Sequence, residues 1–89
     1  MILERFKTFS KSQQFLMIGS EIMRAKVWQN KNQDNFLSAL ERGLELIDFS
    51  LADPKWKNNS FILLYLRDKI SEFYVGFAKY DIEILYQAL

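Results

Sequence analysis

The sequence contains no cysteine and no histidine among its 89 residues, and only one proline and three glycines. Without cysteine the chain can form no disulfide framework and perform no thiol chemistry. Without histidine it lacks the commonest general base and the commonest metal ligand. Triads of the Ser–His–Asp type, zinc sites built on Cys or His, and Glu-x-x-His di-iron centres are therefore excluded. We expect no catalytic residue, no cofactor and no metal site, and hence a protein that is not an enzyme.

Long apolar runs are also missing. The longest extends from Phe61 to Leu66, far short of the roughly 20 residues that a membrane helix requires. At the N-terminus, Glu4 and Arg5 interrupt the apolar residues at once, so we expect no signal peptide. With 49% hydrophobic and 26% charged residues the composition is that of a globular protein. We expect a cytoplasmic chain that forms one domain over residues 1–89 and does not contact membranes.

Apolar residues recur at helical spacing through most of the chain, and no alternating strand pattern extends beyond a few residues. Short connections between long helices make consecutive helices antiparallel neighbours. We therefore predict an all-α fold, a small up-and-down antiparallel bundle with a short helical arm at the N-terminus. The four predicted helices cover approximately residues 10–31, 34–52, 58–76 and 79–88, and the last two could also form one bent helix.

Local signals set the ends of these helices. Ser10 and Gln13 form a capping box, in which each side chain bonds the other residue's backbone N–H. Pro54 disfavours helical geometry in the residue before it and so ends the second helix. Gly76 is a typical residue just beyond a helix C-terminus. Gly43 lies inside the second helix, where we expect it to allow a close approach of two backbones.

The first two helices carry apolar stripes. On the first, Leu16, Met23 and Val27 form a second stripe beside the main one, so the apolar face is wide enough to contact two neighbours. On the second, apolar residues recur at spacings of three and four, as in a heptad seam. The members of this seam are Leu37, Leu40, Leu44, Ile47 and Leu51.

Charge is distributed in blocks along the chain. Residues 1–31 hold six basic and two acidic side chains, whereas residues 32–54 hold one basic and five acidic. Residues 55–69 carry a net charge of +3 and residues 70–89 of −2. Helices that pack side by side with complementary rims explain these blocks, and we favour that interpretation over a bipolar surface that orients a partner.

Glu41, Glu45 and Asp48 follow one face of the second helix. Carboxylates in such a row could bind a hard cation such as Mg²⁺, which would point to a Mg²⁺-dependent enzyme. A solvated helix face opposite a leucine seam has the same pattern. We favour the solvated face.

Lys55-Trp56-Lys57 is the one locally unusual motif. An aromatic ring between two cations can stack on a base while the lysines contact phosphates. This pattern predicts the alternative function, a nucleic-acid-associated accessory protein that uses these three residues and the basic first helix. In the structural interpretation, which we favour, Trp56 folds down and closes the end of the bundle.

Large apolar side chains outnumber the positions that a small bundle can bury. Ile, Leu, Met, Val, Phe, Trp and Tyr make up 39 of the 89 residues, whereas the stripes of four short helices provide about 20 positions. Trp28, Phe49, Tyr80 and Tyr86 fall outside these stripes and are the candidates for an interface. A two-fold dimer would bury one apolar patch against itself. We therefore predict a non-enzymatic protein–protein interaction module that forms a homodimer or binds another protein.

Overall fold

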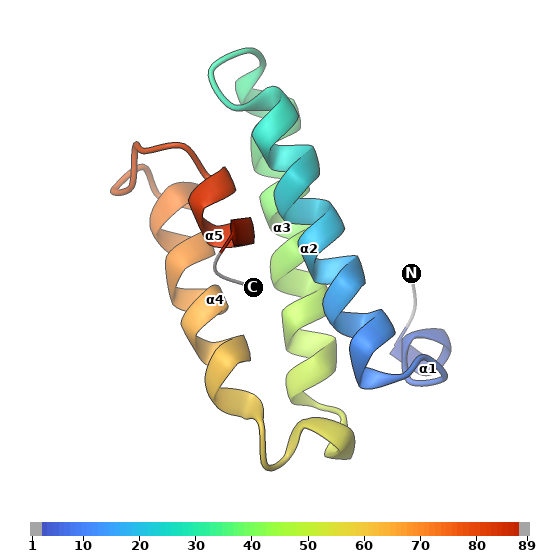
Figure 1. Cartoon of the computed structure of the whole chain (residues 1–89). Coiled ribbons are helices and arrows are strands. Elements are labelled where there is room, and N and C mark those ends of the chain that lie inside the picture. The colour runs from blue at the N-terminus through green and yellow to red at the C-terminus, as the bar shows by residue number, and fades with distance from the viewer. Residues whose placement is uncertain (1–2, 88–89) are drawn as a thin grey trace.

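The computed structural model of the chain describes residues 3–87 (Figure 1). The described residues contain helices and connections but no strand. In chain order the elements are α1 (Leu3–Phe6), α2 (Lys11–Trp28), α3 (Gln33–Leu51), the 3₁₀ turn η1 (Pro54–Trp56), α4 (Ser60–Tyr74) and α5 (Glu83–Gln87).

The three long helices run up and down, as the sequence predicts. α2 and α3 form an antiparallel hairpin, α4 returns along the other side of α3, and α5 packs against α2 (Figure 1). The predicted all-α bundle with a separate N-terminal arm is therefore confirmed, and the last two helices are separate. The last helix is shorter than the predicted span of residues 79–88, because the described chain is irregular from Val75 to Ile82.

A side chain of α2 explains part of this irregular segment. Gln29 donates from its amide nitrogen to the carbonyl of Tyr80 at 2.8 Å and accepts from the backbone N–H of Ile82 at 2.8 Å. Asp81 accepts from the N–H of Glu83 at 2.9 Å, a bond that caps the short helix α5. Backbone groups that a continuous helix would pair internally are thus paired with side chains.

The predicted capping box is present, and the structure adds two further side-chain caps. The backbone N–H of Gln13 bonds the Ser10 hydroxyl at 3.2 Å, and the Ser10 N–H bonds the Gln13 side chain at 2.9 Å, which completes the capping box of α2. Asn32 caps α3 by accepting from the N–H of Asn35 at 3.0 Å. Asp53 caps η1, with Pro54 in its first turn.

Gly76 ends α4 in a Schellman motif. Its φ is +87°, in the left-handed region that favours glycine. The N–H of Phe77 reaches the carbonyl of Glu72 at 2.9 Å, and the N–H of Gly76 reaches the carbonyl of Phe73 at 3.2 Å. These two bonds satisfy carbonyls that the helix end would leave free.

α3 is the central helix, and its buried face is rotated from the predicted seam. Leu40 and Ile47 are buried, but Leu37, Leu44 and Leu51 are only half-buried. The reason is that α2 and α4 lie on two sides of α3, so its buried face is centred between them. The buried residues of α3 are Phe36, Ala39, Leu40, Gly43, Leu46, Ile47 and Ser50.

Gly43 lies on this buried face between α2 and α4. A Cβ atom added there would meet Glu21 Cβ at 3.7 Å and Ile70 Cδ1 at 3.9 Å. Both are ordinary van der Waals distances, so a methyl group fits without displacing either helix. The expectation that Gly43 marks a close approach of two backbones is therefore wrong, since both of these neighbouring atoms belong to side chains.

Candidate interaction surfaces

α4 is apolar around its whole circumference in its first two turns. The run from Phe61 to Leu66 lies in this helix, and only Leu63 and Leu66 of the run are buried against the core. Phe61 is 81% exposed, and Leu64 and Tyr65 are 48% and 40% exposed. These three residues form the outer face of α4. A helix that is apolar all round is normally covered on all sides, so this surface has the properties of an interface.

The second stripe of α2 also faces outward. Leu16 is 68% exposed and Val27 is 53% exposed, while Met23 between them is half-buried. The prediction that this stripe widens the face of α2 toward a second neighbour is met only in part, because Leu16 and Val27 stay exposed. Within residues 3–87 only part of that face is covered.

The four interface candidates from the sequence do not form one patch. Phe49 is half-buried and packs its ring against Phe6 of the N-terminal arm, with ring centres 5.9 Å apart. Tyr80 packs edge-to-face on Phe73 at 4.8 Å, although 42% of it stays exposed. Trp28 is half-buried at the end of α2, and Tyr86 is 43% exposed beside α2. Phe49 lies in the last turn of α3 and Trp28 is the last residue of α2. The C-terminal ends of these two antiparallel helices are at opposite ends of the bundle (Figure 1).

Trp56 lies in the interior, as the structural interpretation of its motif anticipates. It is 5% exposed, its indole N–H donates to Gln14 Oε1 at 2.6 Å, and its ring packs on Phe15 at 6.0 Å. Lys11 Nζ lies 5.0 Å from the ring centre. The ring thus has no open face on which a base could stack in this arrangement.

Lys55 is held by the same cluster. Its ammonium group donates to Asp53 Oδ2 at 2.8 Å and to the carbonyl of Lys7 in the N-terminal arm at 2.8 Å. Buried Gln14 donates both to Asp53 Oδ2 and to the carbonyl of Phe6, each at 3.0 Å. The bonds from Lys55 lower the pKa of Asp53 to about 2, with a further contribution from Gln14 and against the opposing effect of burial. This network fixes the arm and closes the end of the bundle.

The acidic stripe of α3 points to α4 and to solvent. Glu41 accepts a hydrogen bond from the Tyr74 hydroxyl at 2.8 Å, a bond that raises the pKa of the tyrosine. Asp48 pairs with Arg67 at 3.3 Å, and Glu45 is exposed. Over the part of the chain that the structure describes, no three acidic side chains converge as metal ligands would. The two contacts to α4 fit the interpretation of complementary rims.

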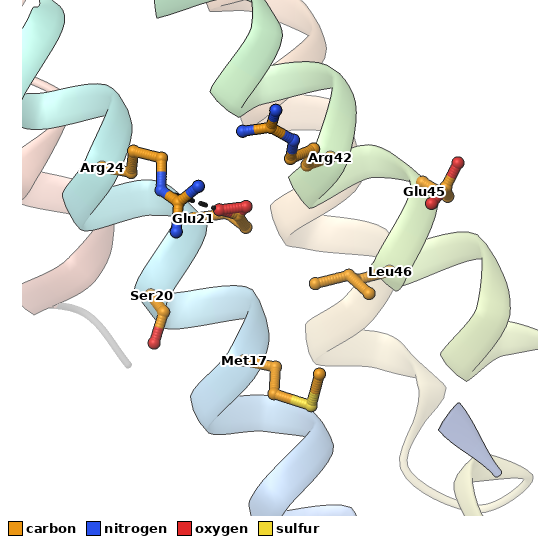
Figure 2. Close-up of a pocket in the computed structure, with 7 residues that line it drawn as sticks. All are labelled: Met17, Ser20, Glu21, Arg24, Arg42, Glu45 and Leu46. Carbon is orange, nitrogen blue, oxygen red and sulfur yellow. Dashed lines mark ion pairs between the residues drawn. The ribbon is translucent and has the colours of Figure 1, made fainter. Parts of the chain in front are cut away.

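A hollow of about 470 Å³ lies between α2 and α3 (Figure 2). Met17 and Leu46 point into it from the two helices, and Arg42 extends toward α2. Glu21 is only 9% exposed and pairs with Arg24 of the same helix at 3.3 Å, so its charge is compensated locally. Glu45 points away from α2. The hollow contains no pair of groups placed for acid–base or nucleophilic chemistry.

The interface candidates drawn from the sequence do not include the outer face of α4. The signal for it was the uninterrupted run from Phe61 to Leu66. Six consecutive apolar residues in a helix point to all of its sides, whereas one neighbouring helix buries only one side.

No helix of residues 3–87 has the length and apolar character needed to cross a membrane. Comparison of the chain with protein-family models, with curated proteins and with solved structures found no match.

Proposed function

We propose that the protein is a non-enzymatic helical interaction module that self-associates through the outer face of α4. The observation that carries this proposal is that α4 is apolar on every side in its first two turns but packs on the bundle through one side only. Phe61, Leu64 and Tyr65 expose large surfaces next to each other, at the spacings of three and four that place residues on one helix face.

A second copy is the favoured partner because the face offers no net charge to oppose it. The chain carries a net charge of +1. Along the middle of α4, Asp68 and Lys69 have opposite charges, and Lys69 also pairs with Glu72 at 3.6 Å. A two-fold arrangement would therefore bury the three apolar residues of each copy against those of the other without a like-charge penalty.

The exposed areas set the expected strength of the dimer. Complete burial of a large apolar side chain contributes about 1.5–3 kcal/mol. Phe61 is 81% exposed and the other two residues are about half exposed, so the three contribute roughly 4 kcal/mol per copy and roughly 8 kcal/mol per dimer. Association costs at least about 4 kcal/mol. The difference is at most about 4 kcal/mol, which corresponds to a dissociation constant of about 1 mM or higher and describes a transient dimer.

Sedimentation equilibrium between about 20 μM and 2 mM, a range chosen around that constant, tests the proposal. The apparent mass should rise above the monomer mass of 10.6 kDa as the concentration increases. Phe61→Glu should keep the mass at that of the monomer without loss of helical circular dichroism, because Phe61 is not in the core. Leu16→Glu is the matched control, since it changes an equally apolar exposed residue on α2. A constant 10.6 kDa for the unmodified protein would contradict self-association.

A further inference from the structure

The fourth helix position of the bundle is only partly filled. α2, α3 and α4 have 18, 19 and 15 residues, whereas α5 has five. At a rise of about 1.5 Å per residue, α5 covers about 8 Å beside a helix of about 27 Å. In Figure 1, α5 lies between the upper part of α4 and α2, and it packs against α2. Much of the length of α2 is thus without a neighbour on this side among the described residues.

Two adjoining hollows lie along the uncovered part and have Phe15 in common. We call them together the α2 groove. The larger has a volume of about 700 Å³ and is lined by Phe15, Leu16, Gly19, Ser20, Met23 and Tyr86. The smaller has a volume of about 310 Å³ and is lined by Lys11, Ser12, Phe15, Trp56, Asn59 and Ile62.

The shape of the groove suits the side chains of a helix. Gly19 and Ser20 are the small residues of its lining, Gly19 buried and Ser20 exposed, and Leu16 and Met23 lie one turn to either side of them on α2. A large apolar side chain can pack over small residues between two apolar neighbours, as a knob enters a hole in coiled-coil packing. Amphipathic helices bind apolar grooves in this way, with anchors spaced by three and four residues.

The chain's own segment in the fourth position shows which chemistry α2 accepts. Ile82 and Leu85, three residues apart, are 0% and 2% exposed and reach the core. Asp81 and Glu83 beside them both pair with Lys26 of α2, the second at 3.8 Å. The bound segment is therefore apolar on one side and acidic at its edge, and it lies on a basic helix.

The uncovered part of the groove has the same charge. Its lining includes Lys11 but no acidic residue. Lys57 follows Trp56 at its lower end and is exposed, whereas Lys55, which precedes Trp56, pairs with Asp53 at 2.8 Å. Glu21, the one acidic residue of α2, lines the hollow between α2 and α3, which has Ser20 in common with the groove.

We propose that the α2 groove binds an acidic amphipathic helix of a partner protein. The helix continues the position of α5, inserts a large apolar side chain at Gly19 and Ser20, and places acidic residues near Lys11 and Lys57. A second copy of this chain is the weaker candidate, because α2 facing α2 would bring together two basic helices.

The test is a nuclear magnetic resonance titration of the ¹⁵N-labelled protein, at about 50 μM so that a dimer with a millimolar constant stays dissociated. The probe is a synthetic acetylated 15-residue peptide with leucine at spacings of three and four and glutamate elsewhere. Saturable shift changes should appear at the amides of residues 11–23 and 56–62 and at the Trp56 indole. A peptide with lysine in place of glutamate should bind at least about tenfold more weakly.

Leu16→Glu should weaken binding of the acidic peptide at least about tenfold, because it places a carboxylate in the groove opposite those of the peptide. Phe61→Glu is the matched control and should bind as the unmodified protein does. The proposal is overturned by the absence of saturable shifts up to about 1 mM peptide, the top of a range typical of weak binding. Three other results would also overturn it. The lysine peptide could bind as tightly as the acidic one, the shifts could be confined to the outer face of α4, or the groove shifts could appear when the protein alone is concentrated.

This inference is independent of self-association through α4. A protein that remains monomeric at all concentrations but binds the acidic peptide would refute the proposed dimer and support the groove. A dimer that Phe61→Glu dissociates, together with a peptide that does not bind, would support the proposed dimer and refute the groove.

Discussion

Replacing Asp53 by asparagine should destabilise the protein by about 2 kcal/mol at neutral pH. The carboxylate is 4% exposed and accepts bonds from the Lys55 ammonium group at 2.8 Å, the Lys55 backbone N–H at 3.0 Å and Gln14 Nε2 at 3.0 Å. These bonds lower its pKa from 3.8 to about 2. Because one pKa unit corresponds to about 1.4 kcal/mol, the charged form stabilises the folded state by about 2 kcal/mol.

The pH dependence identifies this contribution. A carboxyl group with a lower pKa in the folded state stabilises the fold at every pH above its unfolded pKa, here 3.8. The stabilisation decreases as the pH falls below about 4 and is largely lost near pH 2. The unmodified protein and Asp53→Asn should therefore differ by about 2 kcal/mol at pH 7 and by much less at pH 2.

Urea unfolding followed by circular dichroism at 222 nm measures both differences. Asp68→Asn is the control, because Asp68 is exposed on α4, and we expect it to change the free energy of unfolding by less than about 0.5 kcal/mol at either pH. A gap between the unmodified protein and Asp53→Asn that is the same at pH 7 and pH 2 would refute the assigned role of the carboxylate. An Asp53→Asn protein as stable as the unmodified one at pH 7 would refute it as well.

Three further substitutions test the packing by the same urea assay. Gly43→Ala should raise the free energy of unfolding by about 0.5–1 kcal/mol, since the methyl group fits and alanine favours helix; a lower midpoint would show that the crossing is tighter than described. Gly76→Ala should lower it by about 1–2 kcal/mol, because alanine is strained at a φ of +87°; no change would mean that α4 ends differently. Trp56→Phe should lower it by about 1–3 kcal/mol by leaving the buried Gln14 oxygen without its donor, and an unchanged midpoint would argue against that bond.

The features that the sequence predicted well depend on short-range signals. Ser10 and Gln13 are three residues apart, and their reciprocal bonds need nothing from the rest of the chain. Gly76 likewise ends α4 through bonds within five residues. The helical spacing of the apolar residues was enough to predict the long helices. A helix that buries one face has apolar residues at spacings of three and four, whichever element covers that face.

The features that the sequence could not predict depend on contacts between distant residues. The sequence favoured a buried Trp56 but not its partner: Gln14, 42 residues earlier in the chain, accepts the indole N–H and also donates to Asp53. The extent of the last helix was overestimated because Gln29, more than 50 residues earlier, pairs with the backbone of Tyr80 and Ile82. In both cases a glutamine amide makes the contact, and a single polar side chain leaves no periodic pattern from which a contact could be inferred.

The sequence indicated more large apolar residues than the bundle can bury, but only the structure shows which of them are exposed. An aromatic residue outside a stripe, such as Phe49 or Tyr80, can still pack on a ring from a neighbouring segment, and both do. An apolar residue within a helical stripe can be exposed when no helix lies opposite, as Leu16 is. Burial therefore depends on how many neighbours each helix has. α3 has neighbours on two sides, and none of its large apolar residues is exposed. α2 and α4 lie at the edges of the bundle, and each has large apolar residues that stay exposed. Both proposed binding surfaces therefore lie on these two helices.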